Sequence, residues 1–238
     1  MSADVNPVGA MFGKIAGVYD LLNRVLSFGI DQYWRAELVA LAIWDEKRPL
    51  FDLAAGTLDV AIALHRRFPE AIIAGIDFCP AMLRKGASKL KKLGVGNRIF
   101  PCAGDALSIP AKDDACSSLT MAFGIRNIPD RSRAFREMYR ALAPGGRACI
   151  LEFGSGQEKI WGGLYNFYLD KILPRIGRAV SRDDGAYSYL AETIRAFPSA
   201  DRLARELDDA GFEKIGYRKL TSGVVCLHWG EKPRDGRG

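Results

Sequence analysis

Three carboxylates, each within or at the end of one of three successive apolar segments of the chain, could together bind a cationic nucleoside. Asp77 follows Gly56 by about 20 residues, the separation at which an acid accepts hydrogen bonds from ribose hydroxyls in nucleotide-binding sheets. Asp105 is placed to accept a hydrogen bond from an adenine amino group, with Ala106 facing the ring. Asp52 lies in the first apolar segment, just before the turn that contains Gly56.

The turn itself, AAGTLD, decides against a polyphosphate ligand. It lacks the G-x-G-x-x-G spacing, and no Gly-Lys-Ser/Thr follows Gly56 and Thr57. Three nearby acids would also repel phosphates. S-adenosylmethionine fits better, because it carries a sulfonium, an ammonium and a ribose. Taken singly, each acid has an ordinary alternative: Asp52 would cap a helix, and Asp77 and Asp105 would be turn residues.

Strands and helices alternate along residues 49–153, which predicts an α/β fold with a doubly wound, mostly parallel sheet. The expected strands cover residues 50–54, 71–77, 98–104, 115–123 and 147–153. The expected helices cover residues 58–68, 80–93 and 131–142. In such sheets, ligands bind beyond the carboxyl ends of the strands, near the point where the strand order reverses.

The remaining segments predict helical additions and an antiparallel edge within one domain, 1–238. Residues 10–42 predict two helices, the second capped by Asp31. Residues 155–198 predict a helical insertion. Residues 199–230 predict a helix that stops at Gly211, followed by a hairpin joined at TSG. The polar ends, 1–8 and 231–238, are expected to be loose.

Composition narrows the class of protein. The five cysteines are scattered without a CxxC pair, which argues against a disulfide framework or a zinc site and favours a cytoplasmic protein. The sequence contains no run of 18 apolar residues, so no membrane-spanning helix is expected. The N-terminus lacks a signal-peptide pattern. The net charge of +6 comes from dispersed basic residues. No basic stripe with stacking aromatics is present, so nucleic acid is not an expected partner.

Longer motifs show that the chain resembles the ubiquinone/menaquinone biosynthesis C-methyltransferases. The resemblance extends from Phe12 to Gly230, and its most distinctive stretch is FGIRNIPD. Other matching stretches are YDLLNRVLSFGIDQYWR (19–35), LAPGGRACILEF (142–153), AYSYLAETIRAFP (186–198) and AGFEKIGYRKLTSGVVCLHWG (210–230). The combination of these motifs is specific to that family.

The resemblance implies the seven-stranded class I methyltransferase fold (Rossmann-like), with S-adenosylmethionine as the methyl donor. Its cofactor-binding positions fall on Thr57, Asp77, and Asp105 with Ala106. Two residues depart from the family pattern: Ala122 replaces a serine, so a side-chain contact with the cofactor is lost, and Leu58 replaces a glycine. We expect the Leu58 side chain to point into the helix–sheet interface; the alternative is that it intrudes on the methionine end of the donor.

The family reaction methylates a ring carbon of a polyprenylated quinol. The sulfonium methyl is already electrophilic, so no metal is expected. Ionising a ring hydroxyl, whose pKa is about 10 for a phenol, makes the adjacent carbon nucleophilic. Arg126 is expected to stabilise the quinolate oxygen, Asn127 to orient it, and Tyr19 to hydrogen-bond the second ring oxygen.

Each of these roles has a structural alternative. Arg126 would form an ion pair with an acid such as Asp130, and Tyr19 would simply pack. His228 is considered as a general base, but a packed strand histidine is favoured.

The expected partners are a polyprenylated quinol, a transient peripheral contact with a membrane surface and a second copy of the chain as a homodimer. An apolar helical face with basic neighbours within 159–178 is the candidate membrane contact, with core packing as its alternative. Two other functions stay open: methylation of another lipophilic small molecule, and a degenerate member that binds quinone or a protein without turnover.

Overall fold

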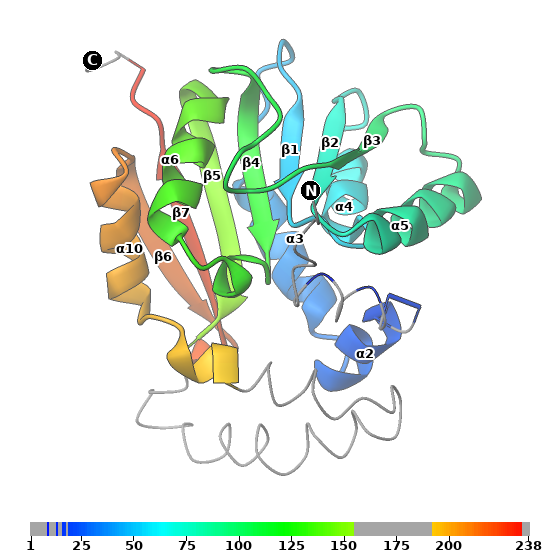
Figure 1. Cartoon of the computed structure of the whole chain (residues 1–238), viewed down its shortest axis with the longest axis horizontal. Coiled ribbons are helices and arrows are strands. Elements are labelled where there is room, and N and C mark those ends of the chain that lie inside the picture. Colours follow the sequence, from blue (N-terminus) through cyan, green and yellow to red (C-terminus); the bar gives the residue numbers. More distant parts are fainter. Residues whose placement is uncertain (1–8, 10–12, 14–15, 18, 155–191, 235–238) are drawn as a thin grey trace, which may run out of the picture.

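Seven strands form one sheet in the order β3-β2-β1-β4-β5-β7-β6 (Figure 1). The computed structural model describes residues 9, 13, 16–17, 19–154 and 192–234. The parallel strands are β1 (Leu50–Leu53), β2 (Ile73–Asp77), β3 (Ile99–Ala103), β4 (Cys116–Ala122) and β5 (Leu142–Phe153). The strand order reverses between β1 and β4, as the doubly wound prediction requires.

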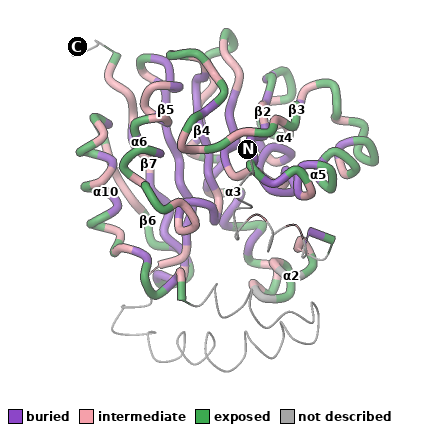
Figure 2. The backbone as a smooth tube through the Cα atoms, viewed as in Figure 1, coloured by how far each residue is buried: buried purple, intermediate pink, exposed green. Residues whose placement is uncertain are grey.

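The central strands are buried on both faces because helices cover both sides of the sheet. All four residues of β1 are buried, and β4 is buried over six of its seven residues. Continuous burial of this kind is typical of parallel strands. Figure 2 shows the buried backbone concentrated in these strands.

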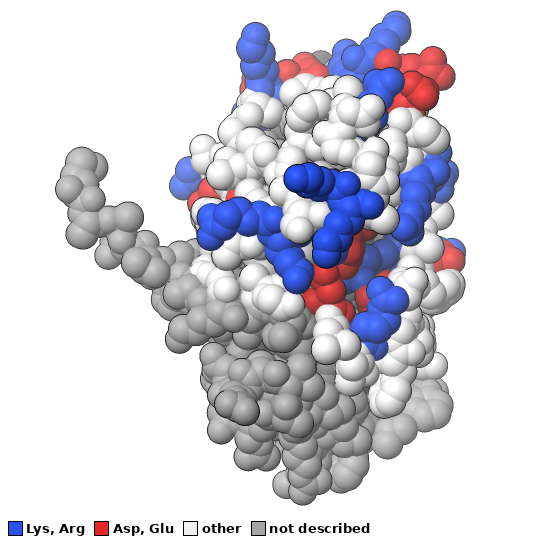
Figure 3. All heavy atoms as spheres, turned by 90° about the vertical axis from the view of Figure 1, so that its right-hand side faces the viewer, with Lys and Arg blue, Asp and Glu red and all other residues white. Residues whose placement is uncertain are grey.

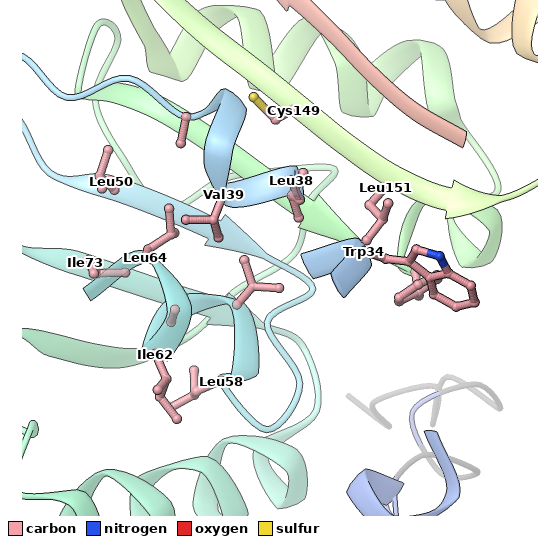
Figure 4. Close-up of a cluster of buried hydrophobic side chains, with 14 of the residues drawn as sticks. Trp34, Leu38, Val39, Leu50, Leu58, Ile62, Leu64, Ile73, Cys149 and Leu151 are labelled. Carbon is pink, nitrogen blue, oxygen red and sulfur yellow. The ribbon is translucent and has the colours of Figure 1, made fainter. Parts of the chain in front are cut away.

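Two apolar cores lie on opposite faces of the sheet. One packs α3 (Asp31–Leu41), α4 (Asp59–Arg67) and α5 (Pro80–Leu93) against the sheet; ten of its side chains are labelled in Figure 4. The other packs α6 (Arg131–Ala141) and α10 (Ala200–Asp209). The predicted cofactor region therefore lies on a framework that is covered on both sides.

The antiparallel edge confirms the predicted hairpin. β6 (Glu213–Leu220) and β7 (Val225–Glu231) pair antiparallel, and η3 (Thr221–Gly223) connects them. β7 also pairs antiparallel with β5. Gly211, at φ 95°, follows the end of α10 as predicted, in a conformation that glycine adopts without strain.

Three local predictions are wrong. Asp31 does not cap α3: Ile30 occupies that position, and the Asp31 carboxylate is paired with Arg35 one turn later. The fifth strand begins at Leu142 rather than 147, since its PGG stretch pairs through an irregular register. Glu231 is not loose, because it ends β7 and forms an ion pair with Arg147.

The N-terminal helix α2 (Tyr19–Leu26) lies beyond the carboxyl ends of the strands (Figure 1). Among the described residues, no helix is both long and apolar enough to cross a bilayer. The predicted insertion lies mostly outside the described residues, including its aromatic face within 159–178.

Candidate active site

The turn after β1 is wound tightly enough to bring backbone groups to the edge of the sheet. Ala54, Gly56 and Leu58 all have positive φ, at 50°, 54° and 68°. The Leu58 N–H donates to the Ala55 carbonyl at 2.8 Å, and the chain then enters α4. Residues 54–58 therefore form a tightly wound turn at the predicted cofactor position.

Asp77 holds this turn in place. Its Oδ2 accepts a hydrogen bond from the Gly56 N–H at 2.8 Å, and its Oδ1 accepts one from the Cys79 N–H at 2.7 Å. Burial raises the pKa of the carboxyl, and these two hydrogen bonds oppose the rise. Each carboxylate oxygen can accept more than one hydrogen bond. Asp77 can therefore both shape the turn and accept hydrogen bonds from a ligand.

Asp52 is a buried acid with one oxygen satisfied. Its Oδ1 accepts a hydrogen bond from the Thr120 hydroxyl at 2.9 Å, whereas its buried Oδ2 has no hydrogen-bond partner among the described residues. Burial raises its pKa from 3.8 to about 7, although the Thr120 hydroxyl and the Ala61 N–H oppose the rise. An unsatisfied buried carboxylate oxygen is costly, so Asp52 is suited to receive a cationic ligand group.

Two neighbouring pockets border these acids, and both include Tyr19, the first residue of α2. The residues common to both pockets are Tyr19, Ala54, Gly56, Ala122 and Phe123. The first pocket adds Asp77, Asp105, Ala106, Asn127 and a set of apolar side chains that includes Phe78 and Met82. The second adds Asp52, Thr57 and Arg35. The structure thus brings together every predicted site residue except Arg126.

These residues fit S-adenosylmethionine by their chemistry. The first pocket combines acids with apolar surface, as an adenosine requires. The second pocket offers the unsatisfied Asp52 oxygen to the ammonium of a methionine end, and it also contains Arg35, whose Nη1 is already paired with Asp31. Arg35 was not predicted as a site residue, because its position beside Asp52 depends on how α3 packs on the sheet.

Arg126 does not line either pocket, although it contacts Phe123, which lines both. Its Nη1 is 2.7 Å from Glu152 Oε1 and also donates to the Phe123 carbonyl at 2.7 Å. Only 7% of the Arg126 side chain and 1% of the Glu152 side chain are exposed. The ion pair expected with Asp130 does not form, because Asp130 caps α6 by accepting a hydrogen bond from the Arg133 N–H. A role of Arg126 toward the substrate stays a prediction.

His228 is packed, as the favoured interpretation predicted. Its ring stacks near Tyr217 with centroids 5.3 Å apart, and its Nε2 lies 3.0 Å from the Ala200 carbonyl oxygen. Burial lowers its pKa to about 4. The imidazole is therefore neutral at neutral pH and engaged with the backbone.

A polar cluster that sequence reasoning missed attaches α2 to the cofactor turn. Lys89 Nζ lies 3.0 Å from Asp20 Oδ2 and 3.1 Å from the Thr57 hydroxyl, and it also pairs with Asp59. Thr57 in turn donates to Asp20. Lys89 is four residues from the end of α5, so only the three-dimensional packing reveals its contact with α2.

Leu58 points into the interior, as expected. It is fully buried and lies outside both pockets (Figure 4). Two glycines make room for it: a Cβ on Gly75 would lie 2.4 Å from Leu58 Cδ2, and one on Gly86 would lie 2.6 Å from Leu58 Cγ. The residue does adopt positive φ and precedes α4 rather than forming its first turn. The side chain is thus accommodated by small residues on β2 and α5.

We expect Leu58→Gly to lower the free energy of unfolding by on the order of 2 kcal/mol. The cavity costs about 2–5 kcal/mol, and relief of the left-handed backbone returns about 1–2 kcal/mol. Chemical denaturation of the parent and the variant measures the difference.

The control for this prediction is Gly86→Ala. It should destabilise the parent but partly rescue Leu58→Gly, because the added methyl group then enters the cavity. Donor affinity should stay unchanged throughout. A tenfold gain in affinity on removing Leu58 would instead indicate that the side chain obstructs the pocket.

Donor binding should depend on pH through Asp52. Because the acid is half protonated near pH 7, donor affinity should fall below that pH by up to about tenfold per unit. Calorimetric titrations of the parent and Asp52→Asn test this, since the variant lacks the Asp52 carboxyl and keeps the titrations of the ligand and of other acids such as Asp77. Identical pH profiles would contradict the prediction.

In the protein without donor, the raised pKa of Asp52 makes the fold more stable at low pH, which is opposite to its effect on donor binding. The folded state binds the Asp52 proton more tightly than the unfolded chain does. The resulting contribution to the free energy of unfolding is fully present below about pH 4 and is lost as the pH rises through about 7.

Comparisons with known proteins place this site in a family context. The sequence model of the ubiE/COQ5 methyltransferase family matches residues 1–232. The demethylmenaquinone methyltransferase of Thermus thermophilus is 42% identical, over 94% of this chain and 100% of the relative. The ubiquinone/menaquinone biosynthesis C-methyltransferase UbiE of Geobacter sulfurreducens is 40% identical, over 93% of this chain and 87% of the relative.

A solved structure supports the fold independently. A SAM-dependent methyltransferase from Aquifex aeolicus superposes with a TM-score of 0.58 at 17% identity, covering 77% of this chain and 81% of that chain. At such low identity the comparison supports the arrangement of strands and helices alone.

Proposed function

The chain belongs to the ubiE/COQ5 methyltransferase family, and we propose that it transfers the methyl group of S-adenosylmethionine to a ring carbon of a polyprenylated quinol. The quinol would be demethylmenaquinol or a ubiquinone precursor. The observation that carries the proposal is the pair of adjoining pockets: Asp77 and Asn127 line the first, Asp52 lines the second, and Tyr19 lines both.

The donor, when bound, supplies an electrophilic methyl group. Asp77 is proposed to accept hydrogen bonds from its ribose, and Asp105 from its adenine amino group. Asp52 is proposed to accept one from its ammonium, because the buried Oδ2 has no partner among the described residues. The low exposure of Asp52 and Asp77 keeps water away from these contacts.

Asn127 and Tyr19 are proposed to contact the quinol substrate. Asn127 Oδ1 is buried without a hydrogen-bond partner among the described residues, which supports a role in accepting a hydrogen bond from a ring hydroxyl and so orienting the ring. Tyr19 lies at both pockets and could contact the second ring oxygen. Arg126 is proposed to stabilise the negative charge of the quinolate oxygen electrostatically. It lies next to Asn127 in the short helix η1 (Ile125–Asn127).

The degenerate, non-catalytic alternative loses one of its two motives. Leu58 and Ala122 both favour that hypothesis, but the Leu58 side chain lies in the core away from both pockets. Ala122 does border both pockets, so the serine hydroxyl of the family pattern is absent from the site. Transient membrane contact, a cytoplasmic location and a homodimer stay predictions; the five free cysteines support the cytoplasmic location.

The test is a set of substrates offered with labelled methyl donor. Demethylmenaquinol, a demethylated benzoquinol precursor and an unprenylated lipophilic phenol should be assayed in parallel. Transfer to at least one of the two prenylated quinols, and little to the phenol, is expected. Transfer to the phenol alone would support the alternative that another lipophilic molecule is the substrate.

A further inference from the structure

The N-terminal helical segment exposes an unusual amount of apolar side chain. Leu21 is 56% exposed and Phe28 is 78% exposed, and Val25 and Tyr33 are exposed as well. Leu21 and Val25 are four residues apart on α2 and so share a face. Phe28 stands in the turn between α2 and α3 with φ 52°. A contiguous apolar patch on a protein surface indicates an interaction site.

A strongly basic helix adjoins this patch. α5 carries five basic residues and no acid. Arg84, Lys85, Lys91 and Lys92 are exposed. Two contacts place α5 beside the N-terminal segment: Lys89 with Asp20 on α2, and Lys85 Nζ with the Gly17 carbonyl at 3.4 Å.

Figure 3 shows Lys and Arg side chains gathered on the face to which α5 and α2 contribute. The acids that α2 and α4 bring to this region, Asp20 and Asp59, are already paired with Lys89. The exposed charge of α5 is therefore positive.

From this juxtaposition we propose that the α2–α3 turn and the exposed face of α5 form a docking surface for an anionic lipid bilayer. Apolar side chains that insert at the interface, flanked by basic residues that meet anionic headgroups, are what a peripheral membrane contact requires. Exposed lysines beside the patch favour a bilayer over a protein groove, because protein interfaces are depleted in lysine.

The proposed docking to a bilayer rests on the proposed function, because the bilayer holds the quinol substrate. Tyr19 begins α2 and borders both pockets. Docking through α2 would bring the pocket region to the bilayer that holds a polyprenylated quinol. This surface differs from the predicted contact within 159–178, which lies outside the described residues.

Co-sedimentation of the full chain with vesicles tests the proposal. The vesicles are phosphatidylcholine alone or phosphatidylcholine with phosphatidylglycerol. Binding should be stronger with the anionic lipid and should weaken with salt. Lys91→Glu/Lys92→Glu should lower the apparent affinity at least about tenfold, since each basic residue near the surface contributes about 1 kcal/mol. Phe28→Ser should weaken binding to both kinds of vesicle.

A matched control carries the same change in charge elsewhere. Lys112→Glu/Arg205→Glu alters two exposed basic residues, one in the loop before β4 and one on α10. This variant should bind like the parent. Equal loss in both charge-reversed variants would overturn the proposal, as would a loss confined to Lys171→Glu/Arg175→Glu. Absence of vesicle binding would also overturn it and point to a protein partner.

Turnover separates this proposal from the proposed function. With a short-chain, water-soluble quinol, the docking variants should methylate at the parental rate, whereas with quinol embedded in anionic vesicles they should be slower. Failure of the parent on every quinol would refute the function and leave the vesicle result standing on its own.

Discussion

Replacing Arg126 with alanine is expected to lower the free energy of unfolding by about 3–5 kcal/mol, because it leaves the buried Glu152 carboxylate without its partner. Glu152 would keep hydrogen bonds from backbone N–H groups, including that of Phe153 at 2.9 Å, but these do not neutralise its charge. Equilibrium denaturation in urea measures the loss. A change below about 1 kcal/mol, the size typical of exposed pairs, would contradict the buried ion pair.

The double variant Arg126→Met/Glu152→Met separates stability from chemistry. Removing both charges should recover most of the stability, since a buried ion pair can often be replaced by apolar residues at little cost. Its turnover with a soluble quinol then reports on the reaction. A stable double variant that is at least about 10²-fold slower would support the proposed electrostatic role. Turnover at the parental rate would limit Arg126 to holding its loop.

Replacing Asp77 with alanine should weaken donor binding by at least about 10²-fold. Two hydrogen bonds from ribose hydroxyls to a charged acceptor are worth about 1.5–3 kcal/mol each. Isothermal titration calorimetry measures the change. The alanine also removes the hydrogen bonds that hold Gly56 and Cys79, so lost affinity alone does not identify a direct contact.

A ligand lacking the ribose hydroxyls resolves this ambiguity. The parent should bind S-adenosylhomocysteine much more tightly than its dideoxy-ribose analogue. The Asp77→Ala variant should bind the two about equally, because it lacks the carboxylate that accepts hydrogen bonds from the ribose hydroxyls. An equal preference in parent and variant would show that Asp77 acts only by shaping the turn.

The sheet could be predicted because its signals are local. The apolar segments around Asp52 and Asp77, each followed by an amphipathic helix, predict both the parallel pairing and the edge at which the acids meet. The strand ends then bring Asp77 and Asp105 to one pocket without any further information. Gly211 and the TSG connection likewise mark their helix end and hairpin locally.

The contacts of the charged residues could not be predicted, because they depend on packing between segments that are distant in the sequence. Arg126 pairs with Glu152, 26 residues away, because β4 and β5 are neighbours in the sheet, and nothing near Arg126 in the sequence indicates that choice. Lys89 contacts Asp20 across 69 residues because α5 lies beside α2, which the sequence near either residue does not indicate. The backbone of Leu58 was also unpredictable, since its positive φ is sustained by space at Gly75 and Gly86.

The most direct measurement follows a trideuterated methyl group from S-adenosylmethionine to the quinol by mass spectrometry. The purified chain, donor and reduced demethylated quinol are incubated together, and the product is fragmented. The proposed function predicts the intact trideuteromethyl group on a ring carbon, with the ring hydrogen lost and both hydroxyls free. Label on an oxygen, or no transfer to any prenylated quinol by a protein that binds the donor, would contradict it.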